Sequence, residues 1–399
     1  MHHADWSVEP ILEWLMGDGR RLRCPGELTE QLGQQLLANG CPVARIRLSL
    51  RTLHPLVSGS SFTWWRDQNL VEEYRPPHSI QQSDDYLGSP VEYVQNTGRP
   101  IRYRLDSLEK TKQGHSLLRG LYDDGIRDYV AYPMYQVHSD SYTVFILATD
   151  DQAGFSDQAL VQLEKLSRYL APVMEVLSLD SSAKALLNTY LGERSGQRVL
   201  DGQVQRGDGE VIESVLWYSD LRNFTAISEQ LPPPQLLKLL NCYFEKIKTA
   251  VNEHGGEIMR FIGDAMLIIF PADESRSPQQ ACWDALAAAK MAQRLVREAN
   301  EELGSEGMPE IRYGLGLDLG RVIYGNVGAV DRLDFTVMGN AVNRAARLQE
   351  LTKTNGFPLI TSEAFAAQFD ERAPCRFESC GRIELKGIAE PVKAFGMNY

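Results

Sequence analysis

The stretch GGEIMRFIGDAMLIIF, residues 255–270, decides the fold of the second half of this chain. Residues 257–262 and 265–270 are apolar segments of strand length, and Gly263-Asp264 between them is a two-residue turn signal. The two glycines at the start of the stretch are typical of the end of a preceding helix. The stretch therefore predicts a β-hairpin that carries an aspartate at its tip.

The segments around this hairpin alternate between strand and helix patterns. Before it lie a strand over residues 214–220 and a helix that begins after the three prolines 232–234. After it we expect a helix over 278–303, a strand over 311–319, a turn at Gly320, a second strand to Gly328 and a helix over 341–355. The order βαββαβ predicts an α+β domain of the ferredoxin-like type.

Two aspartates are candidate metal ligands. Asp220 ends the apolar strand VLWYSD, and Asp264 lies on the hairpin tip, so a sheet can bring both to one edge. Because two adjacent carboxylates repel each other, Mg²⁺ or Mn²⁺ is the natural occupant between them. A hard-metal pair suits phosphoryl transfer. Taken alone, each aspartate is more often a turn or cap residue, and spacing does not exclude that interpretation.

Asn343 and Arg347 form a second candidate group. Their i, i+4 spacing places them on one face of the predicted last helix, opposite small and apolar residues. An arginine there can stabilise charge that develops on phosphorus, and an asparagine can orient a ribose. A solvated polar helix face is the alternative interpretation.

Five segments in order resemble the catalytic domain of the class III nucleotidyl cyclases, over nearly half of the chain. They are YSDLRNFT (218–225), GGEIMRFIGDAM (255–266), GLGLDLGRVIYGNVG (314–328), LDFTVMGNAVNRAARL (333–348) and LKGIAEPVKAF (385–395). The resemblance implies that Asp220 and Asp264 bind two divalent ions, Mg²⁺ or Mn²⁺, with help from the backbone carbonyl of Leu221. It also implies that Asn343 positions the ribose and that Arg347 stabilises the transition state.

The implied reaction is attack of the 3′-hydroxyl of a nucleoside triphosphate on its α-phosphate, with release of pyrophosphate. In this family one catalytic domain supplies the metal-binding aspartates of a site and another supplies the asparagine and arginine. The chain carries one such domain with all four residues, so the resemblance implies a homodimer with two shared sites.

Arg260 and Thr336 occupy the positions that read the base in this family. Adenylate-type members have a lysine where this chain has Arg260, and both side chains only donate hydrogen bonds. ATP is therefore the expected substrate, and cyclic AMP the expected product. GTP is disfavoured, because its edge requires an acceptor. CTP or UTP remains an alternative, as does an Arg260 that pairs with a carboxylate and reads no base.

A catalytically degenerate cyclase-like binding module is the alternative from another class. Loss of a metal-binding aspartate or of the asparagine and arginine would indicate it, and all four residues are present.

The N-terminal half is predicted to be a mixed α/β regulatory domain over residues 1–178. DYVAYPMYQ (128–136), the hairpin after it and GFSDQALVQLEKL (154–166) resemble the end of a GAF-type sensory domain, which implies a small-molecule ligand. The hairpin turn is expected at residues 138–140. A helical, glycine-rich linker is expected over 179–212, and the cyclase domain over 213–399.

The predicted helix from Asp157 to Leu177 carries leucines and a valine at alternating spacings of three and four. They are Leu163, Leu166, Leu170, Val173 and Leu177. This seam predicts either packing on the sheet of its own domain or a dimer-forming signalling helix.

Composition excludes several functions. The chain has 399 residues and a formal net charge of −12, which argues against a general nucleic-acid binder and against docking on anionic membranes. No apolar run approaches the ~20 residues of a membrane span, and no basic, apolar leader begins the sequence. A cytoplasmic location is therefore expected. The six cysteines form no CxxC pair, so neither a structural zinc site nor a disulfide framework is expected.

Overall fold

The computed structural model describes residues 6–68, 70–105, 114–137, 142–370, 375–388 and 390–399. The chain divides into two compact units, Met1–Thr189 and Tyr190–Tyr399. The division lies inside the segment 179–212. The turn expected at residues 138–140 lies outside the described residues.

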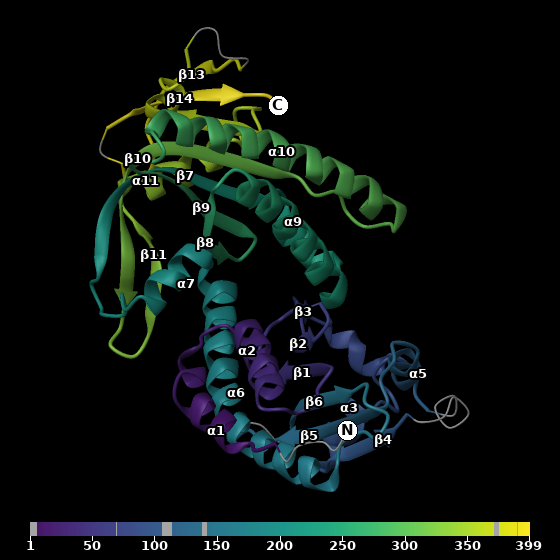
Figure 1. Cartoon of the computed structure of the whole chain (residues 1–399). Helices are drawn as coiled ribbons and strands as arrows, with labels where there is room; N and C mark the ends of the chain where they lie inside the picture. Colours follow the sequence, from purple (N-terminus) through teal and green to yellow (C-terminus); the bar gives the residue numbers. More distant parts are fainter. Residues whose placement is uncertain (1–5, 69, 106–113, 138–141, 371–374, 389) are drawn as a thin grey trace. The chain divides into compact units, whose positions relative to one another are not determined.

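The N-terminal unit is built on an antiparallel sheet with the strand order β3-β2-β1-β6-β5-β4. Its strands are β1 (Arg45–Leu50), β2 (Ser60–Trp65), β3 (Leu70–Tyr74), β4 (Ile101–Arg104), β5 (Asp128–Met134) and β6 (Thr143–Thr149). Alternate side chains of β5 and β6 enter two different apolar clusters, so both faces of the sheet are covered. One face packs against α1 (Glu9–Met16), α2 (Pro25–Ala38) and α6 (Asp157–Leu191), and the other against α3 (Pro90–Thr97) and α5 (Ser116–Asp123) (Figure 1).

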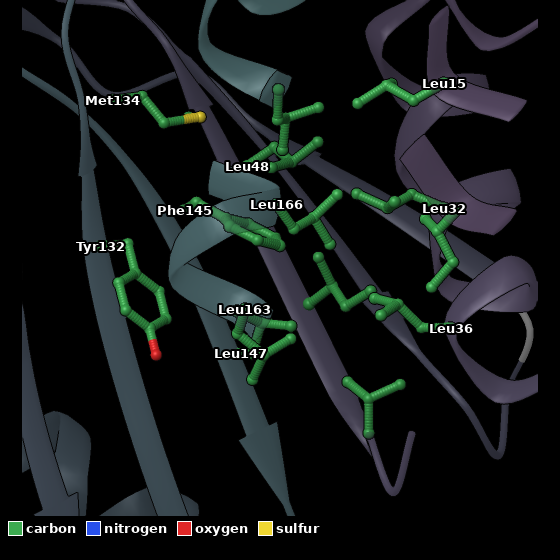
Figure 2. Close-up of a cluster of buried hydrophobic side chains, with 14 of the residues drawn as sticks. Leu15, Leu32, Leu36, Leu48, Tyr132, Met134, Phe145, Leu147, Leu163 and Leu166 are labelled. Atoms are coloured by element: carbon green, nitrogen blue, oxygen red, sulfur yellow. The ribbon is translucent and has the colours of Figure 1, made fainter. Parts of the chain in front are cut away.

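The leucine seam of α6 packs on the sheet of its own unit. Leu163 and Leu166 belong to the same buried apolar cluster as Leu48, Phe145 and Leu147 of the strands (Figure 2). All five seam residues are buried. The first of the two predicted arrangements is therefore the one observed, and this seam is not available for a dimer.

Helix α6 is longer than expected. It continues past Leu177 to Leu191 and contains Pro172 without ending there. Residues 178–191 contain neither glycine nor proline, so nothing in them breaks the helix. The helix ends where Gly192 adopts a φ of +90°, and α7 (Glu193–Leu200) follows directly.

The C-terminal unit has the predicted βαββαβ order. Its elements are β7 (Gly209–Leu221), α9 (Pro233–Glu253), β8 (Glu257–Ile262), β9 (Ala265–Ala272), α10 (Pro278–Ser305) and β10 (Tyr313–Gly328), with the short α8 (Phe224–Gln230) after β7. The four strands lie in the order β10-β7-β9-β8, each antiparallel to its neighbour, which is the ferredoxin-like arrangement. The sheet is extended by β11 (Leu333–Met338), β12 (Leu359–Ser362), β13 (Glu378–Ile383) and β14 (Val392–Met397).

The two faces of this sheet differ in what covers them. On one face α9 and α10 run side by side (Figure 1) and bury Trp217 and Ile268. On the other, α11 (Asn340–Leu351) packs against β7 and β10 and buries Leu216. Because strand side chains alternate, Asp220 lies on the same face as Leu216, which is the face that α11 covers.

The turn expected at Gly320 is wrong, because β10 runs without interruption from Tyr313 to Gly328. The glycines of this strand serve close packing instead. A Cβ atom on Gly316 would overlap the carbonyl oxygen of Ala345 and lie 2.5 Å from the amide nitrogen of Gln349, both in α11. A Cβ atom on Gly320 would lie 2.9 Å from that of Ala341. The helix therefore rests directly on the strand backbone.

In the described part of the chain, no helix is both long enough and apolar enough to cross a membrane.

Gly316→Ala should lower the free energy of unfolding by about 3 kcal/mol, because the added methyl group overlaps helix backbone that cannot move aside. Gly304→Ala in α10 is the matched control. A Cβ atom there meets nothing within 4 Å, so this change should raise stability by up to about 1 kcal/mol. Urea denaturation of the full chain, followed by circular dichroism, measures both. Equal stability of the two variants would contradict the close approach of α11 to β10.

Candidate active site

The carboxyl groups of Asp220 and Asp264 meet at one end of the C-terminal sheet. Asp220 lies near the end of β7, and Asp264 lies in the turn between β8 and β9, where Gly263 adopts a φ of +65°. Ser219 pairs with Met266 across β7 and β9, which places the two aspartates side by side. The two side chains are close enough for Asp220 to raise the pKa of Asp264, and the backbone N–H of Leu221 acts in the opposite direction. The sequence prediction that these two side chains share one edge is confirmed.

This proximity changes the proton affinity of Asp264. Burial and, next, the neighbouring Asp220 raise the pKa of Asp264 to about 6. Because two adjacent carboxylates repel each other, either a proton or a cation stabilises them, and a divalent cation can replace the proton of Asp264.

The two carboxyl groups fit a hard divalent cation that also needs other ligands. Among the described residues no group of three or more His, Cys, Asp and Glu side chains could hold a metal ion. The protein would therefore contribute two carboxylates, and substrate phosphates and water would complete the shell, which is how proteins commonly bind Mg²⁺. The ligand role of the Leu221 carbonyl stays a prediction.

Lys353 is a site residue that the sequence did not reveal. Its Nζ lies 3.2 Å from Oδ2 of Asp220. Lys353 follows the end of α11, and Arg222 holds this position by donating to the carbonyl oxygen of Thr352 at 2.7 Å. Asp220 and Lys353 are 133 positions apart, so no local pattern could have paired them.

Asn343 and Arg347 lie on α11, as predicted, and a buried ion pair fixes this helix. Arg344 donates through Nε (2.8 Å) and Nη2 (2.7 Å) to Oδ2 of Asp318 in β10, whose side chain is fully buried. Burial raises the pKa of Asp318, and Arg344 opposes that shift. Asn343 is exposed, and Arg347 forms an ion pair with Glu350 at 2.7 Å.

Tyr218 lies within electrostatic range of both candidate groups. Its pKa is raised by burial and then by the charges of Asp220 and Asp264, whereas Arg347 lowers it. The aspartate pair and the Arg347 end of α11 therefore belong to the same region of this unit. Tyr218 is two residues before Asp220 in a strand, and that spacing was the available signal for placing its side chain on the site face.

Arg260 forms an ion pair with Asp334, which joins β8 to β11. The sequence left open that this arginine pairs with a carboxylate, and it does. Thr336 lies two residues after Asp334 on the same strand and is buried. The two predicted base-reading residues thus lie on β8 (Arg260) and on β11 (Thr336), and the ion pair of Arg260 with Asp334 joins these two strands. Their contact with a base stays a prediction.

Asp264→Asn should change the pH dependence of stability in metal-free buffer. The folded protein keeps a proton on Asp264 up to about pH 6, whereas the unfolded chain releases it near 3.8. The folded state therefore binds more protons in this window, and the group lowers stability as pH rises through it. In EDTA, the difference between the Tm of the variant and the Tm of the wild type should therefore shift in favour of the variant as pH rises from 4 to 6.

A second arm of the same experiment tests the metal. Mn²⁺ at pH 7 should raise the Tm of the wild type and leave that of Asp264→Asn unchanged, because ligands that bind only the folded state stabilise it. Parallel pH profiles, or an equal Mn²⁺ response in both proteins, would contradict the assignment of Asp264.

Comparison with known proteins shows what this region is similar to. Residues 210–398 match the adenylate and guanylate cyclase catalytic domain. An adenylate cyclase of Anabaena cylindrica is 32% identical over 191 residues, which are 47% of this chain and 36% of that protein. Adenylate cyclase 1 of Rhizobium meliloti (strain 1021) is 32% identical over 177 residues, 44% of this chain and 26% of that protein. The chain thus spans about a third or less of the length of these relatives.

Solved structures of cyclases are also similar to this chain. The guanylyl cyclase Cya2 is 30% identical, with a TM-score of 0.42, over 47% of this chain and 93% of that one. The adenylyl cyclase CyaB from P. aeruginosa is 23% identical, with a TM-score of 0.42, over 48% and 96%. Residues 210–398 of the C-terminal unit thus match the adenylate and guanylate cyclase catalytic domain, and the solved cyclases are similar over the same half of the chain.

Proposed function

We propose that this protein is a nucleotidyl cyclase that converts ATP to 3′,5′-cyclic AMP and pyrophosphate. The observation that carries the proposal is the apposed carboxyl pair of Asp220 and Asp264, on the sheet face covered by the helix that bears Asn343 and Arg347. The family match includes all four residues. Two relatives of about the same identity are named adenylate cyclases.

In the proposed reaction each residue has a separate task. Asp220 and Asp264 would hold two Mg²⁺ or Mn²⁺ ions, together with the Leu221 carbonyl. When bound, these ions lower the pKa of the 3′-hydroxyl and neutralise the phosphates. Asn343 orients the ribose, and Arg347 stabilises negative charge that develops around the α-phosphorus. Holding both reacting groups in line supplies the rest of the acceleration.

A homodimer with two shared sites is part of the proposal. Within one protomer Arg347 pairs with Glu350, and the cation beside Asp220 is Lys353. Although Arg347 lies in the same region as the aspartates of its own protomer, its ion-pair partner there is Glu350, and in the proposed dimer it serves the aspartates of a second copy. An isologous dimer would then create two equivalent sites.

ATP is the proposed substrate because the guanidinium group of Arg260 offers only hydrogen-bond donors, which match an acceptor on adenine. Asp334 engages part of its guanidinium group, which has five N–H donors, and leaves others for an acceptor such as adenine N1. CTP or UTP remains the second candidate, since a pyrimidine also offers acceptors on its edge.

We also propose that the N-terminal unit is a GAF-like regulatory domain that binds a small molecule. The support is its antiparallel sheet with helices on both faces. A single residue, Gly192, separates α6 from α7, the helix that precedes the cyclase domain. This connection gives a ligand in the N-terminal unit a route to the catalytic sheet.

Asp264→Ala and Arg347→Ala should each lower cyclase activity at least about 100-fold, because each removes a group that interacts with developing charge. Mixed in equal amounts and allowed to exchange subunits, the two should recover about one quarter of wild-type activity, since half of the dimers then contain one intact site of two. Product formation from ATP with Mn²⁺ measures this. Failure of the mixture to recover would contradict the shared site. No cyclic product from any nucleotide with the wild type would overturn the cyclase assignment.

Arg260→Ala should raise the KM for ATP about tenfold, the effect of losing one charge-assisted hydrogen bond. Arg382→Ala on the outer strand β13 is the control and should leave KM unchanged. Both are measured with ATP, GTP, CTP and UTP under identical conditions. Preference of the wild type for CTP or UTP would establish the second candidate. An unchanged KM for Arg260→Ala would show that Arg260 reads no base.

A further inference from the structure

A buried polar cluster joins α7 to the catalytic sheet. The carboxylate of Glu257 accepts from the backbone N–H of Ser195 at 3.0 Å and from its hydroxyl at 2.7 Å. The hydroxyl of Tyr324 lies 2.9 Å from Oγ of Ser195 and 3.2 Å from Oε2 of Glu257. These three residues, which we call the Glu257 cluster, come from β8, α7 and β10.

The cluster is enclosed. Ser195 is 0%, Tyr324 1% and Glu257 9% exposed. The guanidinium group of Arg198 lies over the Tyr324 ring, 4.7 Å from its centroid, and forms an ion pair with Glu210 at 2.6 Å. In the described part of the chain, the donors to Glu257 are therefore neutral. A buried carboxylate held only by neutral donors depends on every one of them.

Glu257 occupies the start of the strand that leads to the site. It is the first residue of β8, and β8 carries Arg260 and leads into the turn with Asp264. The register of β8 against β9 shifts between Ile258 and Arg260. A bulge of this kind re-aims the side chains that follow it, so their direction depends on how the strand is held just before the bulge.

The segment that holds this strand lies outside the catalytic family match. Ser195 belongs to α7, residues 193–200, whereas the match begins at residue 210. A Cβ atom on Gly192, just before α7, would lie 3.3 Å from Oε1 of Glu257. The chain before the catalytic domain thus lies closely against this carboxylate.

We propose that Glu257 is a positioning residue: by binding Ser195 and Tyr324 it holds β8 between α7 and β10 and thereby sets the geometry of Arg260 and Asp264. The inference rests on the proposed function in so far as Arg260 and Asp264 are site residues. Loss of a donor leaves the carboxylate short of a hydrogen bond, and the strand end can relieve this only by moving toward water.

The test uses the full chain with Ser195→Ala and Tyr324→Phe, each of which removes one hydroxyl. Ser214→Ala is the matched control, because Ser214 is equally buried in β7 and its hydroxyl donates to the neighbouring Val215 carbonyl, outside the Glu257 cluster. Two readouts need no enzymatic activity: amide hydrogen exchange of residues 257–262, and Mn²⁺ affinity from the electron paramagnetic resonance signal of free Mn²⁺.

Both cluster variants should speed exchange of residues 257–262 about tenfold and weaken Mn²⁺ binding about three- to tenfold, while Ser214→Ala changes neither. A purely structural role would lower the Tm of the two cluster variants and leave their Mn²⁺ affinity alone, which would overturn the proposal. Unchanged exchange in residues 257–262 would overturn it as well. If the wild type makes no cyclic nucleotide, the proposed function fails, and these two readouts still decide the role of Glu257.

Discussion

The direct contact between the backbones of α11 and β10 at Gly316 is the constraint on which the catalytic unit depends. Without a side chain at this position, the helix lies on the strand itself, and the buried pair of Arg344 and Asp318 fixes its position. Because Asn343 and Arg347 lie on this helix, the same packing fixes their positions. The aspartates lie on the same face of the sheet, because strand side chains alternate from Leu216 to Asp220. Helix packing and strand periodicity thus bring the candidate groups to one region.

The site places two carboxyl groups, those of Asp220 and Asp264, side by side although their negative charges repel each other. Burial and the neighbouring Asp220 keep a proton on Asp264 up to about pH 6, and Lys353 adds a cation beside Asp220. Removal of that proton favours a divalent cation in its place, which can also bind the phosphates of a nucleotide. The protein as a whole carries a net charge of −12, so attraction of a polyanionic substrate depends on this local arrangement and on the arginines around it.

Sequence reasoning located the hairpin, the βαββαβ order and the meeting of Asp220 with Asp264, since each rests on short-range patterns. It failed at Gly320, which was predicted to be a turn. This glycine lies within β10, and its lack of a side chain lets α11 pack closely on the strand. It also ended α6 at Leu177, because the core seam stops there although the helix continues to Leu191. At Gly320 the packing partner α11 explains the glycine, which local sequence does not show. In α6 the core contacts end near Leu177, but the helix itself does not depend on them and continues.

The sequence by itself determined the strand and helix order and the residue types of the site, because hydrophobic periodicity and turn chemistry act between neighbours in the chain. Only the tertiary structure decided that Lys353 lies beside Asp220, that Arg260 pairs with Asp334, and that Ser195 binds Glu257. The members of each pair are separated by 60 or more positions, and both are surface-type residues with no pattern of their own. Such pairs form because packing of the apolar faces brings the elements together, and polar groups then bond to whatever the packing places within reach.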